Sequence, residues 1–338
     1  MEILQYADNK HYNIGDDIQN GDRIIISCGG RNIGKTFSAK CWFWNRVCET
    51  GKPFVTLVRE VAEVNLVADD FFDNLQARGF LTDINFYSYD VGKNIGKKLC
   101  YQEDGKEICV SIILSLKKSD TIKRMSLENT CGMFFDELIS ENGVYLRNEP
   151  NRLLSIYNTC IRSRELDSFP VLLLGNICGY YCPYFGQWDI EPPPIGETHY
   201  YKNGKLKFMN LPDGVYEKGS VAEFITNMSE TYGDLVNNNT LYTLPLGTCK
   251  KGTHICKILV GNRCVSYDYE NGHMYFSLTD NKENAIVALD IYGNKPIDSI
   301  GFCTQIVRSI KRSMIAKRVL YENNKCYSII MELCKLYN

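Results

Sequence analysis

The stretch CGGRNIGKTFSAKCWF, residues Cys28–Phe43, decides how the chain begins to fold. It follows the β-branched run RIIIS (Arg23–Ser27), which is typical of a short buried strand. After it, apolar side chains recur at the spacing of a helix as far as Cys48. Between strand and helix, the pattern G-x-x-x-x-G-K-[ST] is filled by Gly29, Gly30, Arg31, Asn32, Ile33, Gly34, Lys35 and Thr36.

This order of strand, glycine-rich loop and helix predicts a phosphate-binding loop, the P-loop or Walker A motif. Its glycines allow backbone N–H groups to turn inward around a β-phosphate. Lys35 can bridge the β and γ oxygens, and the Thr36 hydroxyl can ligate Mg²⁺ at the positive end of the following helix. We therefore expect ATP and Mg²⁺ as cofactors. The alternative is a tight turn that happens to contain glycines.

An apolar strand that ends in two acids, MFFDE (Met133–Glu137), supplies the second half of a hydrolytic site. Asp136 would hold the Mg²⁺ or its water, and Glu137 would polarise the attacking water. Such a glutamate indicates ATP hydrolysis coupled to motion, because a kinase for a small molecule has to exclude water. An exposed acid pair is the alternative. A further strand, VLLLGN, ends at Asn176, whose amide either senses the γ-phosphate or forms a turn.

The arrangement of segments predicts an α/β fold. In the first half, apolar strands alternate with helices expected at 35–48, 60–78 and 151–164, which indicates a mostly parallel sheet covered on both faces. Three consecutive prolines, Pro192–Pro194, predict the end of this domain. We expect a P-loop domain at 1–195, a linker with a helical segment (221–236) at 196–245, and a smaller α+β domain at 246–338. Its helices are expected at 305–321 and 325–337.

Composition limits the partners and the compartment. With a formal net charge of -2, the 338-residue chain has no overall basic excess, so any surface that binds nucleic acid must be local. No apolar run reaches membrane-spanning length and no secretory signal is recognisable, so we expect a cytoplasmic protein without a membrane partner. The fifteen cysteines suit reduced thiols. A zinc site is the alternative, with Cys249, His254, Cys256 and Cys264, or Cys178 and Cys182, as candidates.

The P-loop, the adjacent acids and the strand-terminal Asn176 together resemble the RecA-like (ASCE) P-loop NTPases that carry an extra catalytic glutamate. Within that class, Arg31 inside the loop resembles the P-loop of large terminases. The length, the order of the motifs and the small β-containing C-terminal half look like the DNA-packaging ATPases of small short-tailed phages of the Picovirinae type. The motifs that carry this resemblance lie in the first half of the chain.

This resemblance implies a homo-oligomeric ring on the portal of a procapsid, in the cytoplasm of the infected host cell. The ring would drive double-stranded viral DNA inward by ATP hydrolysis. The resemblance also implies an arginine finger that acts in trans. The segment NTCIRSREL offers Arg162 and Arg164, of which we prefer Arg164, because a guanidinium can stabilise charge on the γ-phosphoryl oxygens. Lys123 and Arg124 are further candidates for a contact in trans.

Large terminases also carry an RNase H-like nuclease domain, whose chemistry requires carboxylates clustered on two metals. The acids of the C-terminal half form no obvious constellation: Asp268, Asp280, Asp290 and Asp298. We therefore expect a vestigial nuclease-like domain without cleavage activity. In its place, the run QIVRSIKRSMIAKRVL predicts a helix with one basic side, which either binds phosphates of DNA or of a structural RNA, or only faces solvent. The basic residues are Arg308, Lys311, Arg312, Lys317 and Arg318.

A second basic segment, GKNIGKK (92–98), is expected to form a mobile loop. Its Lys93, Lys97 and Lys98 would contact DNA phosphates without reading bases. Two other functions remain open. One is a RecA-like translocase or helicase outside packaging, which would separate strands without a procapsid. The other is a P-loop kinase for a small molecule, which would not respond to DNA.

Overall fold

The computed structural model describes residues 3–4, 12–18, 23–31, 33–92, 94–140, 143–162, 169–176, 182–212, 228 and 245–337. The chain divides into two compact units. The first comprises Met1–Cys178 and Pro192–Thr240, and the second comprises Gly179–Glu191 and Leu241–Asn338. The helical segment expected at 221–236 lies outside the described residues, except for Met228.

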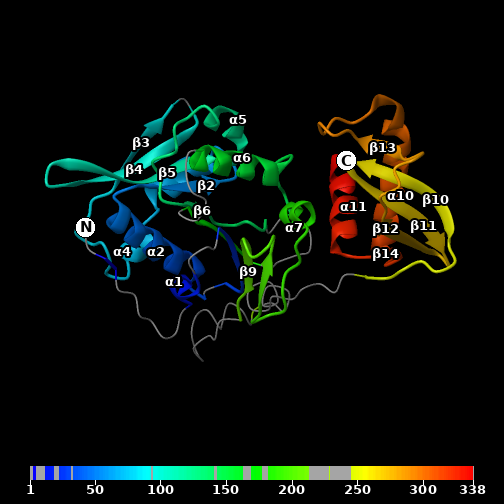
Figure 1. Ribbon diagram of the computed structural model, residues 1–338, viewed down its shortest axis with the longest axis horizontal. Helices are drawn as coiled ribbons and strands as arrows, with labels where there is room; N and C mark the ends of the chain where they lie inside the picture. Colours follow the sequence, from blue (N-terminus) through cyan, green and yellow to red (C-terminus); the bar gives the residue numbers. More distant parts are fainter. Residues whose placement is uncertain are drawn as a thin grey trace. The chain divides into compact units, whose positions relative to one another are not determined.

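The first unit is built on a nine-stranded sheet with the order β3-β4-β5-β2-β6-β7-β1-β9-β8 (Figure 1). Its six central strands, from β5 to β9 in that order, are parallel, and antiparallel strands extend both edges. This confirms the predicted α/β fold with a mostly parallel sheet. The strands are β1 (Ile24–Cys28), β2 (Phe54–Val58), β3 (Tyr87–Val91), β4 (Gly96–Glu103), β5 (Lys106–Ser115), β6 (Met133–Phe135), β7 (Val171–Gly175), β8 (Thr198–Tyr201) and β9 (Leu206–Asn210).

Helices cover both faces of this sheet. The connection from β1 to β2 runs through α2 (Lys35–Thr50), and the connection from β6 to β7 runs through α6 (Glu149–Ile161). These two connections cross the sheet in opposite directions, so right-handed crossovers place their helices on opposite faces. The shorter elements are α1 (Ile14–Asp17), α3 (Glu63–Asp69), α4 (Asp73–Gln76), η1 (Leu116–Lys118) and α5 (Ser119–Ile122).

The single helix expected at 60–78 is two short helices, α3 and α4. Between them, Phe71 and Phe72 are buried in the core beneath α2. Their rings pack edge to face, with centroids 4.8 Å apart. The helical repeat is interrupted here, because Phe72 is the N-cap of α4 and its φ of -104° and ψ of 5° lie outside the helical region.

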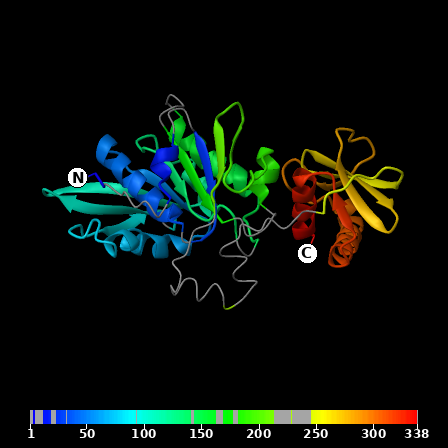
Figure 2. The same ribbon diagram turned by 90° about the horizontal axis from the view of Figure 1, so that it is seen from below.

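The first unit does not end at the three prolines. Residues beyond Pro192–Pro194 form the hairpin of β8 and β9, and β9 pairs in parallel with β1 (Figure 2). Ile24 is paired with Leu206, and Cys28 with Asn210. The structure therefore differs from the boundary expected at residue 195, because the prolines occupy an irregular segment after which the chain returns to the sheet.

The second unit is α+β, with a five-stranded sheet in the order β13-β10-β11-β12-β14. The buried side chains of α10 and α11 share one core with the inward residues of these strands. The elements are α7 (Pro183–Trp188), β10 (Thr253–Val260), β11 (Arg263–Glu270), β12 (His273–Leu278), β13 (Ile286–Leu289), η3 (Ile297–Ser299), α10 (Ile300–Ile315), β14 (Val319–Tyr321) and α11 (Asn324–Leu336).

The helix expected at 305–321 starts earlier and stops earlier than predicted. It is α10, Ile300–Ile315, and the residues from Val319 form β14. Lys317 has a φ of 54°, a left-handed conformation that ends the helix. Lys317 and Arg318 therefore lie in the turn after the helix and not on its basic side. Within the described ranges, no helix combines the length and the apolar composition needed to cross a membrane.

Candidate nucleotide-binding site

The predicted site residues converge at one edge of the sheet. Strands β6, β7 and β1 are neighbours and parallel, so the segments after them emerge at the same carboxyl edge. The P-loop follows β1, the acids Asp136 and Glu137 follow β6, and Asn176 follows β7. In open α/β sheets, ligands bind at this edge.

The P-loop is shaped by Gly34 and closed by Lys35. Gly34 has a φ of 91°, which glycine adopts without strain, and α2 begins at the next residue. The Lys35 ammonium donates to the backbone oxygens of Gly29 and Gly30, at 3.0 and 2.6 Å, and to Asn176 Oδ1 at 3.0 Å. Burial lowers the pKa of Lys35 to about 8. The predicted sensor residue and the P-loop lysine thus contact each other. Asn32 lies outside the described residues.

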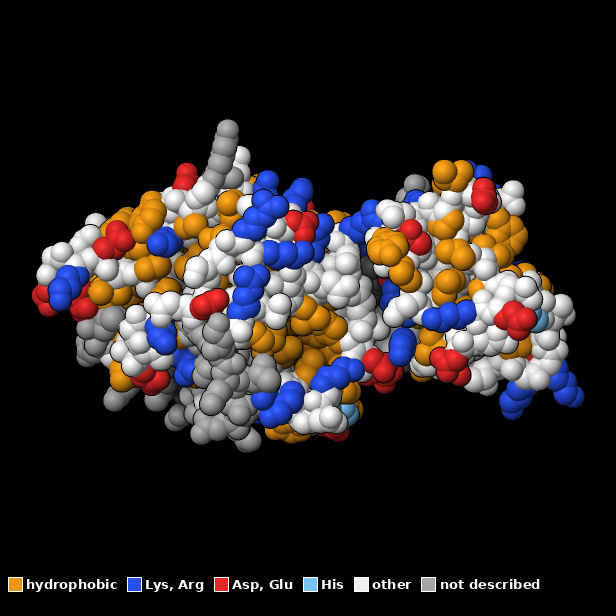
Figure 3. All heavy atoms as spheres, turned by 45° about the horizontal axis from the view of Figure 1, so that its top comes forward, with side chains coloured by type: hydrophobic (Ala, Val, Ile, Leu, Met, Phe, Trp, Pro, Cys, Tyr) orange, Lys and Arg blue, Asp and Glu red, His pale blue; other side chains and the backbone are white. Residues whose placement is uncertain are grey.

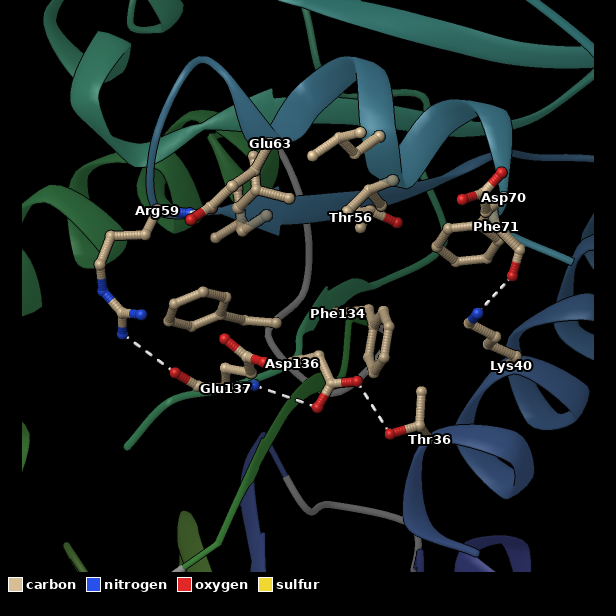
Figure 4. A pocket seen from close by; sticks show the side chains of 15 residues that line it. Thr36, Lys40, Thr56, Arg59, Glu63, Asp70, Phe71, Phe134, Asp136 and Glu137 are labelled. Atoms are coloured by element: carbon tan, nitrogen blue, oxygen red, sulfur yellow. Dashed lines mark hydrogen bonds between the residues drawn. The ribbon is translucent and has the colours of Figure 1, made fainter. Parts of the chain in front are cut away.

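A hydroxyl and a carboxylate stand where the Mg²⁺ ligands were expected. The Thr36 hydroxyl donates to Asp136 Oδ2 at 2.8 Å, and Asp136 Oδ1 accepts the backbone N–H of Glu137 at 3.0 Å (Figure 4). Both groups offer the hard oxygen ligands that Mg²⁺ prefers, and two protein ligands leave room for water and phosphate oxygens. The residues therefore fit a Mg²⁺ ion carried in with a nucleotide.

Glu137 is exposed at this edge, in an unusual backbone conformation. Its φ is 61°, which is uncommon for a residue other than glycine. Such strain is retained where surrounding contacts fix the backbone. Here, its N–H is bonded to Asp136, and its carbonyl oxygen accepts a hydrogen bond from Arg59 Nη2 at 3.0 Å (Figure 4). The carboxylate stays at the surface of the cavity, where it can act on water.

Arg59 was not singled out from the sequence, although it ends a strand at the same edge. It follows β2 directly, and its Nε forms a 3.0 Å ion pair with Glu149 Oε2 at the start of α6. Glu149 is fully buried and also accepts the backbone N–H of Leu146 at 2.8 Å. The rule that selected Asp136, a polar residue after an apolar strand, would also have selected Arg59.

Two cavities meet at the expected metal ligands. One, of about 650 Å³, is lined by the P-loop, both acids and Asn176, and also by Phe37, Asn74 and Arg78. This size suits a nucleotide. The other, of about 390 Å³, lies between α3 and the strands β2 and β6 and is lined by residues that include Lys40 and Phe71 (Figure 4). Both cavities share Thr36, Asp136 and Glu137.

The residues predicted to act in trans lie away from this cavity. Arg162 follows α6, and its Nη2 donates to the backbone oxygen of Lys123 at 3.0 Å. The 13 residues of α6 span about 20 Å, so Arg162 is far from the Glu149 end that adjoins the site. Lys123 and Arg124 are exposed after α5. Figure 3 shows that Lys and Arg side chains gather on one face of the first unit. Arg164 lies outside the described residues.

The residues predicted to bind nucleic acid belong to different elements of the two units. Lys97 and Lys98 are half-buried within β4 and not in a loop as expected, and Lys93 lies outside the described residues. On α10, Arg308 and Arg312 are exposed and one helical turn apart, which keeps the predicted basic side. Lys311 is half-buried. Burial raises the pKa of the nearby Cys334 thiol to about 11, and the charge of Lys311 offsets only part of this rise.

The zinc candidates that the structure describes form no metal site. Among the residues that the structure describes, no three His, Cys, Asp or Glu side chains are placed to hold a metal ion. His254 is bonded to Asp268 instead, with 2.9 Å between Nδ1 and Oδ1. Cys178 lies outside the described residues.

A P-loop, a strand-terminal acid pair and a polar residue after the neighbouring strand define a RecA-like P-loop NTPase. The sequence comparison then names the family: the profile of the podovirus DNA encapsidation protein (Gp16) matches residues 7–235, which is more than half of the chain. The chain therefore belongs to this family. A relative, the DNA packaging protein of Bacillus phage B103, is 26% identical over 244 residues, 67% of this chain and 71% of the relative.

Solved structures share the fold over nearly the whole chain. The structure described as the Phi-28 gp11 DNA packaging motor has a TM-score of 0.66 at 15% identity and covers 98% of both chains. The chain from the bacteriophage Phi-29 viral genome packaging motor assembly has a TM-score of 0.65 at 20% identity, over 98% of this chain and 100% of that one.

The buried ion pair between Arg59 and Glu149 generates the first prediction. Replacing Arg59 with Met leaves a fully buried carboxylate without its partner, so we expect the free energy of unfolding to fall by about 3–5 kcal/mol. Urea unfolding measures this change. The control is Lys117→Met, which breaks an exposed 2.8 Å pair with Glu60 and should cost less than about 1 kcal/mol. Equal losses in the two variants would contradict the prediction.

The lowered pKa of Lys35 predicts how polyphosphate binding depends on pH. Below about pH 8, Lys35 is charged in the nucleotide-free protein, and above it the charge is lost. A bound polyphosphate favours the charged form, so binding at higher pH has to take up a proton. We expect the Kd for ATP to be flat below this pH and to rise above it, approaching about tenfold per pH unit.

Titration calorimetry between about pH 7 and pH 9.5 tests this dependence. The matched variant is Lys35→Arg, because a guanidinium keeps its proton through this range. Its Kd, whatever its absolute value, should not rise with pH. A wild-type Kd that stays constant over the range would show that Lys35 keeps its charge and would contradict the prediction.

Proposed function

We propose that the chain is an ATP-driven motor that translocates double-stranded viral DNA into a procapsid. Membership of the DNA encapsidation family supports DNA packaging as the process. The geometry of the site supports ATP hydrolysis as the energy source. The observation that carries the proposal is the contact of Thr36 with Asp136 beside Lys35, with Glu137 exposed at the same edge. This arrangement suits hydrolysis of MgATP, which supplies the free energy for translocation.

In the proposed mechanism, the P-loop backbone and Lys35 would bind the β and γ oxygens, and Thr36 with Asp136 would hold a Mg²⁺ ion, which when bound would neutralise charge on the phosphates. Glu137 orients and polarises the attacking water, since its carboxylate is exposed while hydrogen bonds fix its backbone. Asn176 bonds to Lys35, so the sensor residue detects a γ-phosphate through the lysine that binds it.

We place the site between subunits of a homo-oligomeric ring. Because Arg162, Lys123 and Arg124 lie away from their own cavity, they suit a contact with a neighbouring subunit's nucleotide better than a contact in cis. An arginine there would stabilise charge on the γ-phosphoryl oxygens. Arg164, two residues beyond Arg162, stays the preferred finger. The ring would act on the procapsid portal in the cytoplasm of the infected host cell, with a structural RNA as a further partner.

Glu137 provides the direct test of the motor. We expect ATP turnover that long duplex DNA stimulates, and we expect Glu137→Gln to lower turnover by about 100-fold or more, because the base that activates water is lost. The Kd for ATP should change little. Phosphate release with and without DNA measures the effect, and Glu128→Gln is the control because Glu128 is also exposed and does not line the cavity.

Other outcomes of that assay separate the alternatives. Turnover indifferent to DNA, or phosphate transferred to a small acceptor, would remove the motor and favour the kinase. Strand separation without a procapsid would favour a helicase. If turnover responds as expected, packaging of DNA into purified procapsids is the next measurement.

We also propose that α10 contributes phosphate contacts, in a nuclease-like unit without cleavage activity. Replacing both Arg308 and Arg312 with Ala should weaken duplex DNA binding and reduce the slope of log K against log salt by about 2, one for each lost phosphate contact. Lys250→Ala with Lys251→Ala is the control, because both lysines are exposed in the same unit. An unchanged slope would show that this side of α10 only faces solvent. Nicking of plasmid DNA by the protein in the presence of Mg²⁺ would contradict the proposal that this unit does not cleave DNA.

A further inference from the structure

One wall of the nucleotide cavity comes from α4 and the turn that follows it, a segment without a recognised motif. Asn74 and Arg78 line the same 650 Å³ cavity as Lys35 and Thr36. The guanidinium carbon of Arg78 lies over the ring of Phe37, 4.7 Å from its centroid. Phe37 directly follows Thr36 in the first turn of α2. Arg78 is therefore held beside the P-loop of its own subunit.

The turn that carries Arg78 is well defined. Gly79 has a φ of 86°, which lets the chain reverse, and its N–H donates to the carbonyl of Gln76 at 2.9 Å. The side-chain amide of Gln76 donates to two carbonyl oxygens further along the turn, at 3.0 and 2.9 Å. Phe80 packs edge to face on Phe37, with ring centroids 5.8 Å apart. Arg78 and Phe80 thus both contact the Phe37 ring, and the position of Arg78 is set by the fold.

The charge of Arg78 is available to a ligand. The side chain is exposed, and among the described residues its guanidinium has no hydrogen-bond acceptor and no ion-pair partner. Stacking on Phe37 occupies one face of the guanidinium and leaves its N–H groups for hydrogen bonds. Arginine favours this use, because its planar fork stacks on aromatic rings and bonds to phosphate oxygens.

We propose that Arg78 binds the nucleotide in cis, through the α-phosphate of ATP or ADP. This inference rests on the proposed ATP site. Lys35 and Thr36 serve the β and γ oxygens, next to Asp136. Phe37 is the next residue along α2, so the arginine stacked on it faces the phosphate beyond the β position. Because ATP and ADP share that phosphate, Arg78 contributes equally to the binding of both.

The test is equilibrium binding of MgATP, MgADP and inorganic tripolyphosphate to the full-length protein without DNA. Arg78→Ala should raise the Kd of all three by about tenfold or more, the loss expected for a charged hydrogen bond to phosphate. The Kd values of Arg78→Lys should lie between those of the wild type and of Arg78→Ala, because lysine keeps the positive charge but lacks the planar set of N–H donors. Lys52→Ala is the matched control: it removes an exposed charge just beyond the other end of α2, about 24 Å away, and should change each Kd by less than twofold.

Three results would overturn the inference. The first is a Kd for ATP in Arg78→Ala that matches the wild type. The second is a weaker affinity for ATP and ADP with an unchanged affinity for tripolyphosphate, which would place the contact on the nucleoside. The third is a selective loss of ATP affinity with normal ADP affinity, which would place it on the γ-phosphate. Unchanged thermal unfolding without nucleotide shows that the variant is folded.

Lys35→Ala separates this inference from the proposed function. If Lys35→Ala abolishes ATP binding and Arg78→Ala does not weaken it, the ATP site stands and only the role of Arg78 fails. If the wild type binds no ATP, or Lys35→Ala binds it normally, the proposed function itself fails.

Discussion

The alignment of three parallel strands controls everything else at the nucleotide site. Cys28, the last residue of β1, is paired with Gly175, the last residue of β7. On the other side of β7, Phe135 at the end of β6 is paired with Leu173. The three strands therefore end nearly level, and the segments after them lie within side-chain reach. A shift of one residue would turn alternate side chains to the opposite face and separate Thr36 from Asp136.

The site has its charges in place without a ligand. Lys35 is held close to neutral oxygens of the P-loop and Asn176, and its burial disfavours the ammonium form. A bound polyphosphate removes that cost, because it stabilises the charged ammonium. This gain contributes to the free energy of nucleotide binding. Arg59 and Glu149 differ, because they neutralise each other inside the protein. Their pair connects the end of β2 to the start of α6, and Arg59 also fixes the backbone of Glu137.

Local patterns predicted the P-loop side of the structure well, because its determinants are local. A strand, a loop of fixed spacing and a helix are encoded in consecutive residues, and Asp136 and Asn176 are marked by the apolar strands before them. Pairings between distant segments leave no such mark. Nothing local in β9 indicates that it joins β1, and the prolines before it suggested the end of a domain. Arg78 is similar, because its place in the cavity depends on how the turn after α4 packs on α2.

The placement of α7 affects how the chain can acquire its structure during synthesis. This helix lies between β7 and β8 in the sequence but belongs to the second unit, where Gly186 packs tightly against Ser328 and Asp189 forms a 3.0 Å ion pair with Lys325 of α11. A ribosome delivers β9 well before α11, so the central sheet can close while α7 still lacks its partner. Until α11 emerges, the helix therefore lacks its contacts with Ser328 and Lys325. Neither unit can be cut out as one continuous stretch of the polypeptide.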